Sequence, residues 1–226
     1  HMVSKNISKV FIFLLLLGSF GACTSEKSSE ENVTDMNSIP AAEEEKQFLE
    51  IGIQQLSSWS SHWKSNAPDF NSQSFVYSRT DSLEQIERPE EIHIVKDSPF
   101  FPYLKEHPEG EGVVDIYSYK VVFPEEGTPY FNPDAEVTYF KSDGMRERLL
   151  FMGPSGVFED AVWLTSDALL VVGHFESEKG VSPKAWIIYP KRGQVSQYDN
   201  PLHTKSYIRE SFLTKRFSRL KKQDGV

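Results

Sequence analysis

The stretch AEVTYFKSDGMRERLLFM, residues 135–152, reads as two strands joined by a tight turn. Residues 135–141 have the alternation of a half-buried strand, and residues 146–152 supply a second strand. The connection Ser142-Asp143-Gly144-Met145 contains Asp-Gly, a pair that readily adopts the left-handed backbone of a short hairpin turn. The stretch therefore predicts an antiparallel hairpin.

Short strands continue on both sides of this hairpin. Residues 113–123 (VVDIYSYKVVF) read as one long strand before it. Four more strands are expected after it, at residues 161–164, 169–176, 184–189 and 194–198. Short strands at such regular spacing are typical of antiparallel meanders. We therefore expect an α+β domain that is mostly β, arranged as a sandwich, an open barrel or a strongly curled sheet.

The segment before the meander is expected to contain both strands and a short helix. Residues 74–79 and 91–96 read as two short strands. Between them, Asp81-Ser82-Leu83-Glu84 has the spacing of a capping box, which predicts a short helix that ends at Pro89.

An N-terminal helix is expected over residues 41–63. Leu49, Ile53 and Leu56 recur at intervals of three and four, which is the spacing of one helix face. Gly52 should weaken this helix by about 1 kcal/mol relative to alanine. We expect the apolar face to pack against the β-rich domain.

The C-terminal segment, residues 206–222, has a pattern that is compatible with an amphipathic helix. Phe212, Leu213 and Phe217 fall on one side, and basic residues flank them. A basic amphipathic helix can bind a membrane or a partner, but more often it packs on its own domain. We expect packing.

The charge of the chain argues against one class of partner. The sequence has 33 acidic and 24 basic residues and a formal net charge of −9. A nucleic-acid-binding domain usually carries a basic patch and a basic isoelectric point. We therefore expect no nucleic-acid partner.

The sequence contains no motif that assigns catalysis. A nucleophile elbow, a phosphate-binding glycine loop and an H-E-x-x-H pair are all missing from it. The histidines considered as ligands, which have no metal-ligand spacing, are His62, His93, His107, His174 and His203. We assign no catalytic, metal-binding or cofactor-binding residue and expect no cofactor.

Two groups of acidic and amide residues were considered as glycosidase or calcium sites. They are Glu106, Glu109, Glu111 and Asp115, and then Asn132, Asp134 and Glu136. Paired carboxylates can hydrolyse glycosides, and oxygen-rich loops can bind calcium. Neither group has a specific loop signature, so we interpret both as solvated loops and leave the two site readings as alternatives.

Several aromatic residues could stack on a sugar ring. The candidates are Trp163, Trp186, Tyr117, Tyr119, Tyr139 and Tyr198. In the predicted strand 113–123, Tyr117 and Tyr119 share a face with Val113 and Val121, which is the pattern of a core. We therefore expect these aromatic residues to be buried.

The N-terminal 22 residues have the parts of a secretory signal. Lys5 and Lys9 are positive, residues 10–17 (VFIFLLLL) are apolar, and small residues follow. The apolar run is shorter than the roughly 20 residues that span a bilayer. The sequence Phe20-Gly21-Ala22-Cys23 then resembles the pattern of an aliphatic residue, two small residues and cysteine that bacterial lipoproteins carry, with Phe20 where leucine is commonest.

This resemblance implies a lipid anchor. Cys23, the one cysteine of the chain, would carry fatty acyl chains such as palmitate and attach the protein to a membrane. Bacterial lipoproteins carry three such chains, and several chains together hold more firmly than one. The chain then divides into a signal peptide (1–22), a lipidated flexible tether (23–40) and a single β-rich globular domain (41–226) with the N-terminal helix at 41–63.

The sequence of the tether also indicates where in the cell envelope the protein is expected. Its acidic, serine-rich start is loosely similar to the surface-export signals of lipoproteins in the Bacteroidetes. Thr24 stands where a lipoprotein retained in the inner membrane commonly has aspartate, so we expect the outer membrane, on either its periplasmic or its outer side.

Three functions agree with these features. We favour a non-enzymatic module that binds or assembles an envelope protein or glycan. The alternatives are an envelope hydrolase acting on glycan or peptide, and a periplasmic inhibitor or immunity protein. A cleft holding His174 or His203 beside a carboxylate and a serine would indicate the hydrolase. An exposed loop at Phe100-Phe101-Pro102-Tyr103 would indicate a binder or inhibitor.

The anchor can be tested by labelling. Because the acyl chains attach to the cysteine sulfur, Cys23→Ser should abolish labelling of the protein by a clickable fatty acid. Label that persists in the variant contradicts the lipoprotein interpretation.

Overall fold

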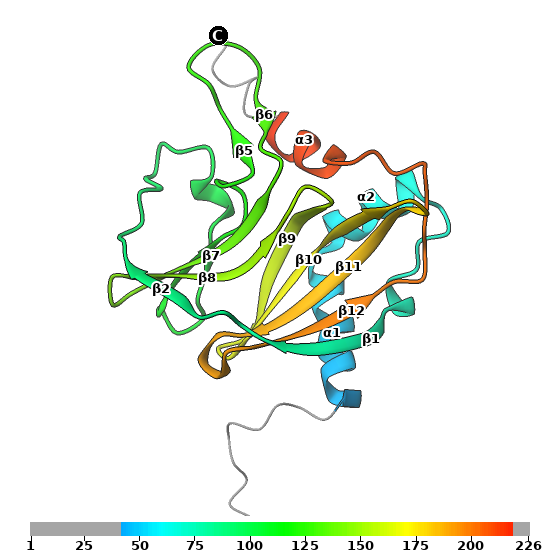
Figure 1. Ribbon diagram of the computed structural model, residues 1–226, viewed down its shortest axis with the longest axis horizontal. Coiled ribbons are helices and arrows are strands. Elements are labelled where there is room, and N and C mark those ends of the chain that lie inside the picture. Colours follow the sequence, from blue (N-terminus) through cyan, green and yellow to red (C-terminus); the bar gives the residue numbers. More distant parts are fainter. Residues whose placement is uncertain (1–41, 219–226) are drawn as a thin grey trace, which may run out of the picture. The chain divides into compact units, whose positions relative to one another are not determined.

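Two five-stranded antiparallel sheets make up most of the fold (Figure 1). The computed structural model of the chain describes residues 42–218, so the predicted signal, Cys23 and the tether lie outside the described residues. The described residues belong to one compact unit, Pro40–Val226. The predicted mostly β, antiparallel fold with a helix near each end is confirmed.

Sheet A contains the second half of the meander. Its strand order is β1-β12-β11-β10-β9, so four strands that follow one another in the chain lie side by side and β1 completes the edge. The bounds are β1 Val76–Ser82, β9 Gly156–Thr165, β10 Ala168–Ser177, β11 Gly180–Tyr189 and β12 Gln194–Asp199.

Sheet B is built around the hairpin predicted at residues 135–152. Its order is β2-β8-β7-β4-β3, and neither sheet closes on itself. The bounds are β2 Ile86–Pro89, β3 Lys105–Glu106, β4 Gly112–Asp115, β7 Ala135–Lys141 and β8 Met145–Met152. The β7–β8 turn has Gly144 at φ +87°, as the Asp-Gly signal predicts. A small hairpin, β5 Val121–Val122 and β6 Tyr130–Phe131, forms a third sheet.

The single strand predicted over residues 113–123 is wrong. The chain leaves sheet B after Asp115, because its carboxylate accepts hydrogen bonds from the amides of Tyr117 (2.9 Å) and Ser118 (3.1 Å) and stabilises a turn. Lys120 N–H then donates to the Tyr117 carbonyl at 2.9 Å before β5 begins. A short-range side-chain turn therefore overrides a strong β pattern.

The short helix predicted after Asp81 is also wrong. Asp81 and Ser82 end β1, where they pair with Val195 and Gln194 of β12, and β2 follows as a strand paired with β8. Strand pairing with distant segments outweighs the local capping signal. The strand predicted at residues 91–96 is a loop in which Ile94 is buried.

The predicted N-terminal helix is interrupted at Leu56. It forms α1 Ala42–Gln55 and α2 Ser57–Asn66, and its apolar face is buried as expected. Gly52 is the point of closest approach to sheet A, since a Cβ there would lie 2.5 Å from methyl groups of Leu164 and Leu170. The residue that weakens the helix locally thus permits its packing.

The C-terminal helix is shorter than predicted. It forms α3 Ser211–Ser218, which buries Phe212, Leu213 and Phe217, and residues 219–226 lie outside the described residues. Ile208, in the segment before the helix, is 69% exposed. The prediction that this segment packs on its own domain is confirmed for α3.

Three short 3-10 helices complete the fold. They are η1 Ser72–Ser74, η2 Phe101–Tyr103 and η3 Pro190–Arg192. Phe100 and Tyr103 at η2 pack against Phe217 of α3, whereas Phe101 and Pro102 are exposed. The loop that we considered as a protruding contact is therefore anchored at both ends.

Sheet A and its helices are joined by buried carboxylates. Glu45 of α1, 3% exposed, accepts hydrogen bonds from Tyr189 (2.6 Å), Ser196 (3.1 Å) and Tyr198 (2.5 Å) of strands β11 and β12. Burial, together with this carboxylate, raises the pKa of both tyrosine hydroxyls above the usual range. Three donors on one carboxylate fix the start of α1 on the sheet.

A second buried carboxylate, Glu159, lies in β9. The pairing of β9 with β10 shifts by one residue here, because Val172 pairs with Asp160 and the next residue, Gly173, pairs with Phe158. Glu159 is therefore the extra residue of a β-bulge. Glu159 accepts hydrogen bonds from Trp59 (2.7 Å), Trp63 (3.1 Å) and Tyr207 (2.6 Å), and burial raises its pKa to about 7. This carboxylate connects β9 to α2 and to the segment before α3.

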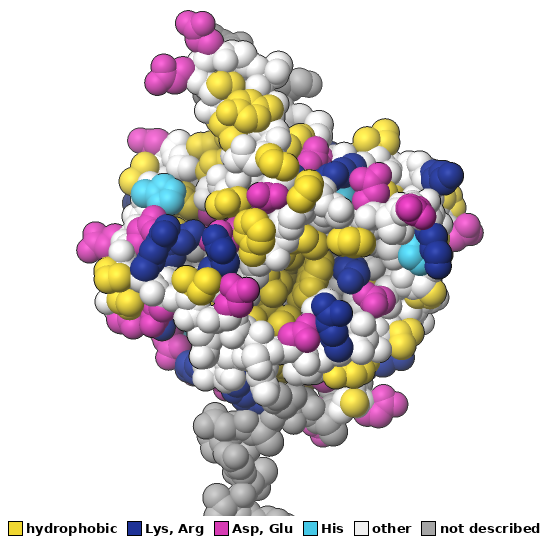
Figure 2. All heavy atoms as spheres, viewed as in Figure 1, with side chains coloured by type: hydrophobic (Ala, Val, Ile, Leu, Met, Phe, Trp, Pro, Cys, Tyr) yellow, Lys and Arg dark blue, Asp and Glu magenta, His cyan; other side chains and the backbone are white. Residues whose placement is uncertain are grey.

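One face of the domain combines apolar and charged side chains. Figure 2 shows hydrophobic side chains gathered near the middle of this face, with Lys, Arg, Asp and Glu around them. A hollow of about 440 Å³ lies between β8 and strands β1 and β12. Both arginines that line it are paired within the chain, since Arg79 contacts Asp81 at 2.7 Å and Arg148 contacts Glu136 at 3.0 Å. Among residues 42–218, no helix is both long and apolar enough to span a bilayer.

The Glu45 junction makes a stability prediction. Glu45→Ala should lower the free energy of unfolding by roughly 2 to 4 kcal/mol, because three buried hydroxyl groups lose their acceptor. Urea unfolding measures the change, and the exposed neighbour Glu44→Ala should alter it by less than about 0.5 kcal/mol. Equal effects of the two substitutions would show that α1 is not held by this carboxylate.

Candidate functional site

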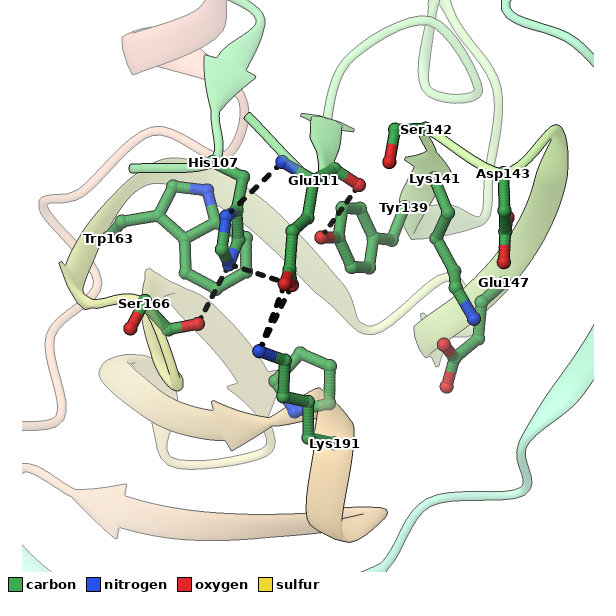
Figure 3. A pocket seen from close by; sticks show the side chains of 11 residues that line it. His107, Glu111, Tyr139, Lys141, Ser142, Asp143, Glu147, Trp163, Ser166 and Lys191 are labelled. Carbon is green, nitrogen blue, oxygen red and sulfur yellow. Dashed lines mark hydrogen bonds and ion pairs between the residues drawn. The ribbon is translucent and has the colours of Figure 1, made fainter. Parts of the chain in front are cut away.

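A pocket lies where four turns of the two sheets converge (Figure 3). Its volume is about 300 Å³, at the lower end of the range for small-ligand sites. The walls come from the β3–β4 turn, the end of the β7–β8 hairpin, the β9–β10 turn and η3. Segments far apart in the sequence thus supply one concave site.

The inner wall of the pocket is aromatic. The ring of Trp163 on β9 lies 4.7 Å from that of His107 and 5.8 Å from that of Tyr139 on β7, measured between centroids. The Trp163 indole N–H donates to the Lys105 carbonyl at 3.2 Å, which fixes the orientation of the ring. His107 and Tyr139 are 4% and 5% exposed, and Trp163 is half-buried.

His107 holds the β3–β4 turn in place. Its Nδ1 accepts the amide of Glu109 at 3.1 Å, so Nε2 carries the proton and donates to the Ser166 carbonyl at 2.8 Å. Gly112 ends the turn with φ +132°, and a Cβ there would lie 2.1 Å from the Phe140 carbonyl oxygen. Because backbone groups engage both of its ring nitrogens, His107 serves as a structural part of the wall and is poorly placed as a base.

Charged groups form the rim. Lys191 of η3 lies 3.1 Å from Glu111 Oε2 and 3.7 Å from Asp167, and the Lys141 ammonium pairs with Glu87 of β2. Hydrogen bonding to Glu87 raises the pKa of Lys141. Both lysines that line the pocket are therefore neutralised by carboxylates.

Glu147 lies across from Tyr139 in the β7–β8 register and also lines the pocket. It is 6% exposed. Burial raises the pKa of Glu147, the Lys141 ammonium partly opposes this by lowering it, and Glu87 raises it by a smaller amount. Burial also raises the pKa of Tyr139 to about 12, and its hydroxyl donates to the Glu111 carbonyl at 3.2 Å.

This arrangement suits a small ring-shaped ligand. Aromatic faces pack against the apolar face of a sugar ring, and the hydroxyl, ammonium and carboxylate groups of Ser142, Lys191 and Glu111 can hydrogen-bond to its edge. A few polar groups on a largely apolar wall are typical of ligand sites.

The predicted burial of the aromatic candidates is largely confirmed. Tyr117, Trp186 and Tyr198 are 1%, 5% and 2% exposed. Tyr119 is 39% exposed, because the turn after Asp115 removes it from the strand face that we expected. The structure brings Trp163 and Tyr139 together as a pocket wall.

The acidic groups considered as sites do not converge. Of the first group only Glu111 lines the pocket, while Asp115 is 4% exposed and stabilises its turn. Of the second, Glu136 is 1% exposed and pairs with Arg146 and Arg148. The solvated-loop interpretation is therefore wrong for Asp115 and Glu136. No group of three or more potential metal ligands occurs within the described part of the chain.

His174 and His203, which would have indicated a hydrolase if they lined a cleft, do not line this pocket. His174 Nε2 is 3.7 Å from Glu159, but His174 is fully buried in the core and its ring nitrogens have no hydrogen-bond partner among residues 42–218. Burial lowers the pKa of His174 to about 3, which keeps the ring neutral. His203 is exposed, and His62 contacts Ser211 at 2.9 Å between α2 and α3. The cleft that would indicate a histidine-based hydrolase is thus not formed by His174.

Sequence reasoning missed Glu147, Lys141 and Lys191 as site residues. Glu147 faces Tyr139 across the hairpin, and this pairing could have been read from the turn at Asp143-Gly144. Lys191 reaches the pocket only because the β11–β12 connection lies beside the β3–β4 turn. Cys23, the one site residue assigned from the sequence, lies outside the described residues.

Comparison of the chain with models of protein families, with curated proteins and with solved structures gave no match.

Proposed function

We propose that this protein is a lipid-anchored, non-enzymatic binding module of the cell envelope, and that its pocket holds one sugar residue of a glycan. The observation that carries the glycan assignment is the wall of Trp163 and Tyr139 beside a polar rim. A sugar ring presents both an apolar face and hydroxyl groups, so it complements such a wall and rim.

The anchor and the acidic balance support the location. The resemblance at Cys23 implies attachment to a membrane, with the outer membrane favoured, and the tether gives the domain reach from the lipid surface. The net charge of −9 disfavours nucleic acid and close contact with anionic headgroups. An envelope glycan or a glycan-bearing envelope protein is the partner that agrees with both features.

The binding test uses the full-length chain and a panel of methyl glycosides. Isothermal titration calorimetry should show saturable binding of at least one glycoside, and Trp163→Ala should weaken it at least about tenfold, which equals about 1.4 kcal/mol. The loss follows from removal of the stacking surface.

Tyr119→Ala is the control, because Tyr119 is an exposed aromatic residue outside the pocket. It should leave the affinity unchanged, and circular dichroism should show that both variants are folded. Binding that survives Trp163→Ala contradicts the pocket assignment.

A second candidate, a glycan hydrolase, is favoured by one observation. Glu111 and Glu147 both line the pocket, in different environments: Glu111 is ion-paired with Lys191, and the pKa of Glu147 is raised by burial. Glycoside hydrolysis requires two carboxyl groups beside the sugar whose environments push their pKa values apart.

Release of nitrophenol from nitrophenyl glycosides distinguishes the two candidates. A hydrolase would release it at a rate that Glu147→Gln reduces by several orders of magnitude, because the proton donor is removed. Saturable binding of the same glycosides without release supports the binding module.

A further inference from the structure

Glu147 differs from the other buried glutamates of the domain. Glu45 accepts three hydrogen bonds, Glu159 accepts three, and Glu136 is held by Thr138 and two arginines. Glu147, 6% exposed, takes part in no hydrogen bond and no ion pair among residues 42–218, although the nearby Lys141 ammonium lowers its pKa through space. A largely buried carboxylate without a hydrogen-bond donor in its own chain can accept one from a ligand that enters the pocket.

A hydrogen-bond donor with positive charge would complement this carboxylate. The pocket is lined by three carboxylates, Glu111, Asp143 and Glu147, and by two lysines. Those lysines already pair with carboxylates, Lys141 with Glu87 and Lys191 with Glu111. The remaining field is negative, which attracts a cation.

The aromatic wall of the pocket also favours a positively charged ligand. Tyr139 lies directly opposite Glu147 across strands β7 and β8, on the same sheet face. The Tyr139 and Trp163 rings are 5.8 Å apart, and aromatic faces attract ammonium groups through cation–π interaction. A protonated amine at this position would contact the carboxylate and lie beside the rings.

We propose that the pocket recognises an amino sugar, with the protonated amine on Glu147 and the sugar ring against Trp163. This assignment rests on the proposed glycan-binding function. An alkyl amine such as a lysine side chain would satisfy Glu147 but would leave the rim groups Ser142 and Lys191 without the ring hydroxyls that an amino sugar offers them.

Calorimetry of the full-length chain with three methyl glycosides tests the proposal. The probes are the methyl glycosides of glucosamine, N-acetylglucosamine and glucose, which present an ammonium, a neutral amide and a hydroxyl at the same carbon. The ammonium form should bind at least about tenfold more tightly than the other two, and Glu147→Gln should reduce it to their level while leaving theirs unchanged.

Glu125→Gln is the matched control, because Glu125 is exposed in the β5–β6 connection, away from the pocket. It should not alter any affinity. Without ligand, Glu147→Gln should unfold at the same or a higher temperature than the wild type, because an unpartnered buried charge is removed. A clear loss of stability would instead assign Glu147 a structural role and overturn the proposal.

The other outcomes distinguish a failure of the amino-sugar assignment from a failure of the glycan-binding function. Equal binding of the three glycosides, or an amine preference that survives Glu147→Gln, overturns the amino-sugar assignment and leaves the glycan-binding function intact. Absence of binding by all three overturns both. If Nα-acetyl-lysine methylamide binds as tightly as the glucosaminide and with the same dependence on Glu147, the site recognises a peptide amine and the amino-sugar assignment is wrong.

Discussion

Asp160 of β9 is the charge that holds together the segments next to the pocket. It is 3% exposed and lies 3.0 Å from the Lys105 ammonium and 2.9 Å from the Arg216 guanidinium. Burial alone would raise the pKa of Asp160, but these two cations hold it below the usual value. The bulge at Glu159 places a second buried carboxylate beside it, so β9 is joined to β3 through Lys105, to α2 through Trp59 and to α3 through Arg216.

The pocket depends on this junction. Lys105 begins the segment that carries His107 and Glu111, and its carbonyl accepts the indole N–H of Trp163 from the same strand as Asp160. The ion pair and the hydrogen bond together fix the β3–β4 turn against β9. Turns that are held in this way keep the side chains of the pocket, Glu147 among them, in fixed positions.

The sequence predicts the local structure better than it predicts the site. Strict patterns such as Asp143-Gly144 identify the hairpin, and the apolar spacing of Leu49 and Ile53 identifies the helix, because these signals act within a few residues. The turn at Asp115 and the pairing of Asp81 with Val195 depend on a side-chain hydrogen bond and on distant strands. The pocket depends entirely on such distant pairings, so Trp163 and Tyr139 looked like ordinary core residues.

We propose above that an amine-bearing sugar occupies this pocket with Glu147 as its counter-ion. A crystal structure of the full-length chain grown with the methyl glycoside of glucosamine tests it most directly. The ammonium nitrogen is expected within about 3 Å of the Glu147 carboxylate, with the ring against Trp163. A sugar bound elsewhere on the domain, or seated in the pocket with its amine turned toward solvent, would contradict it.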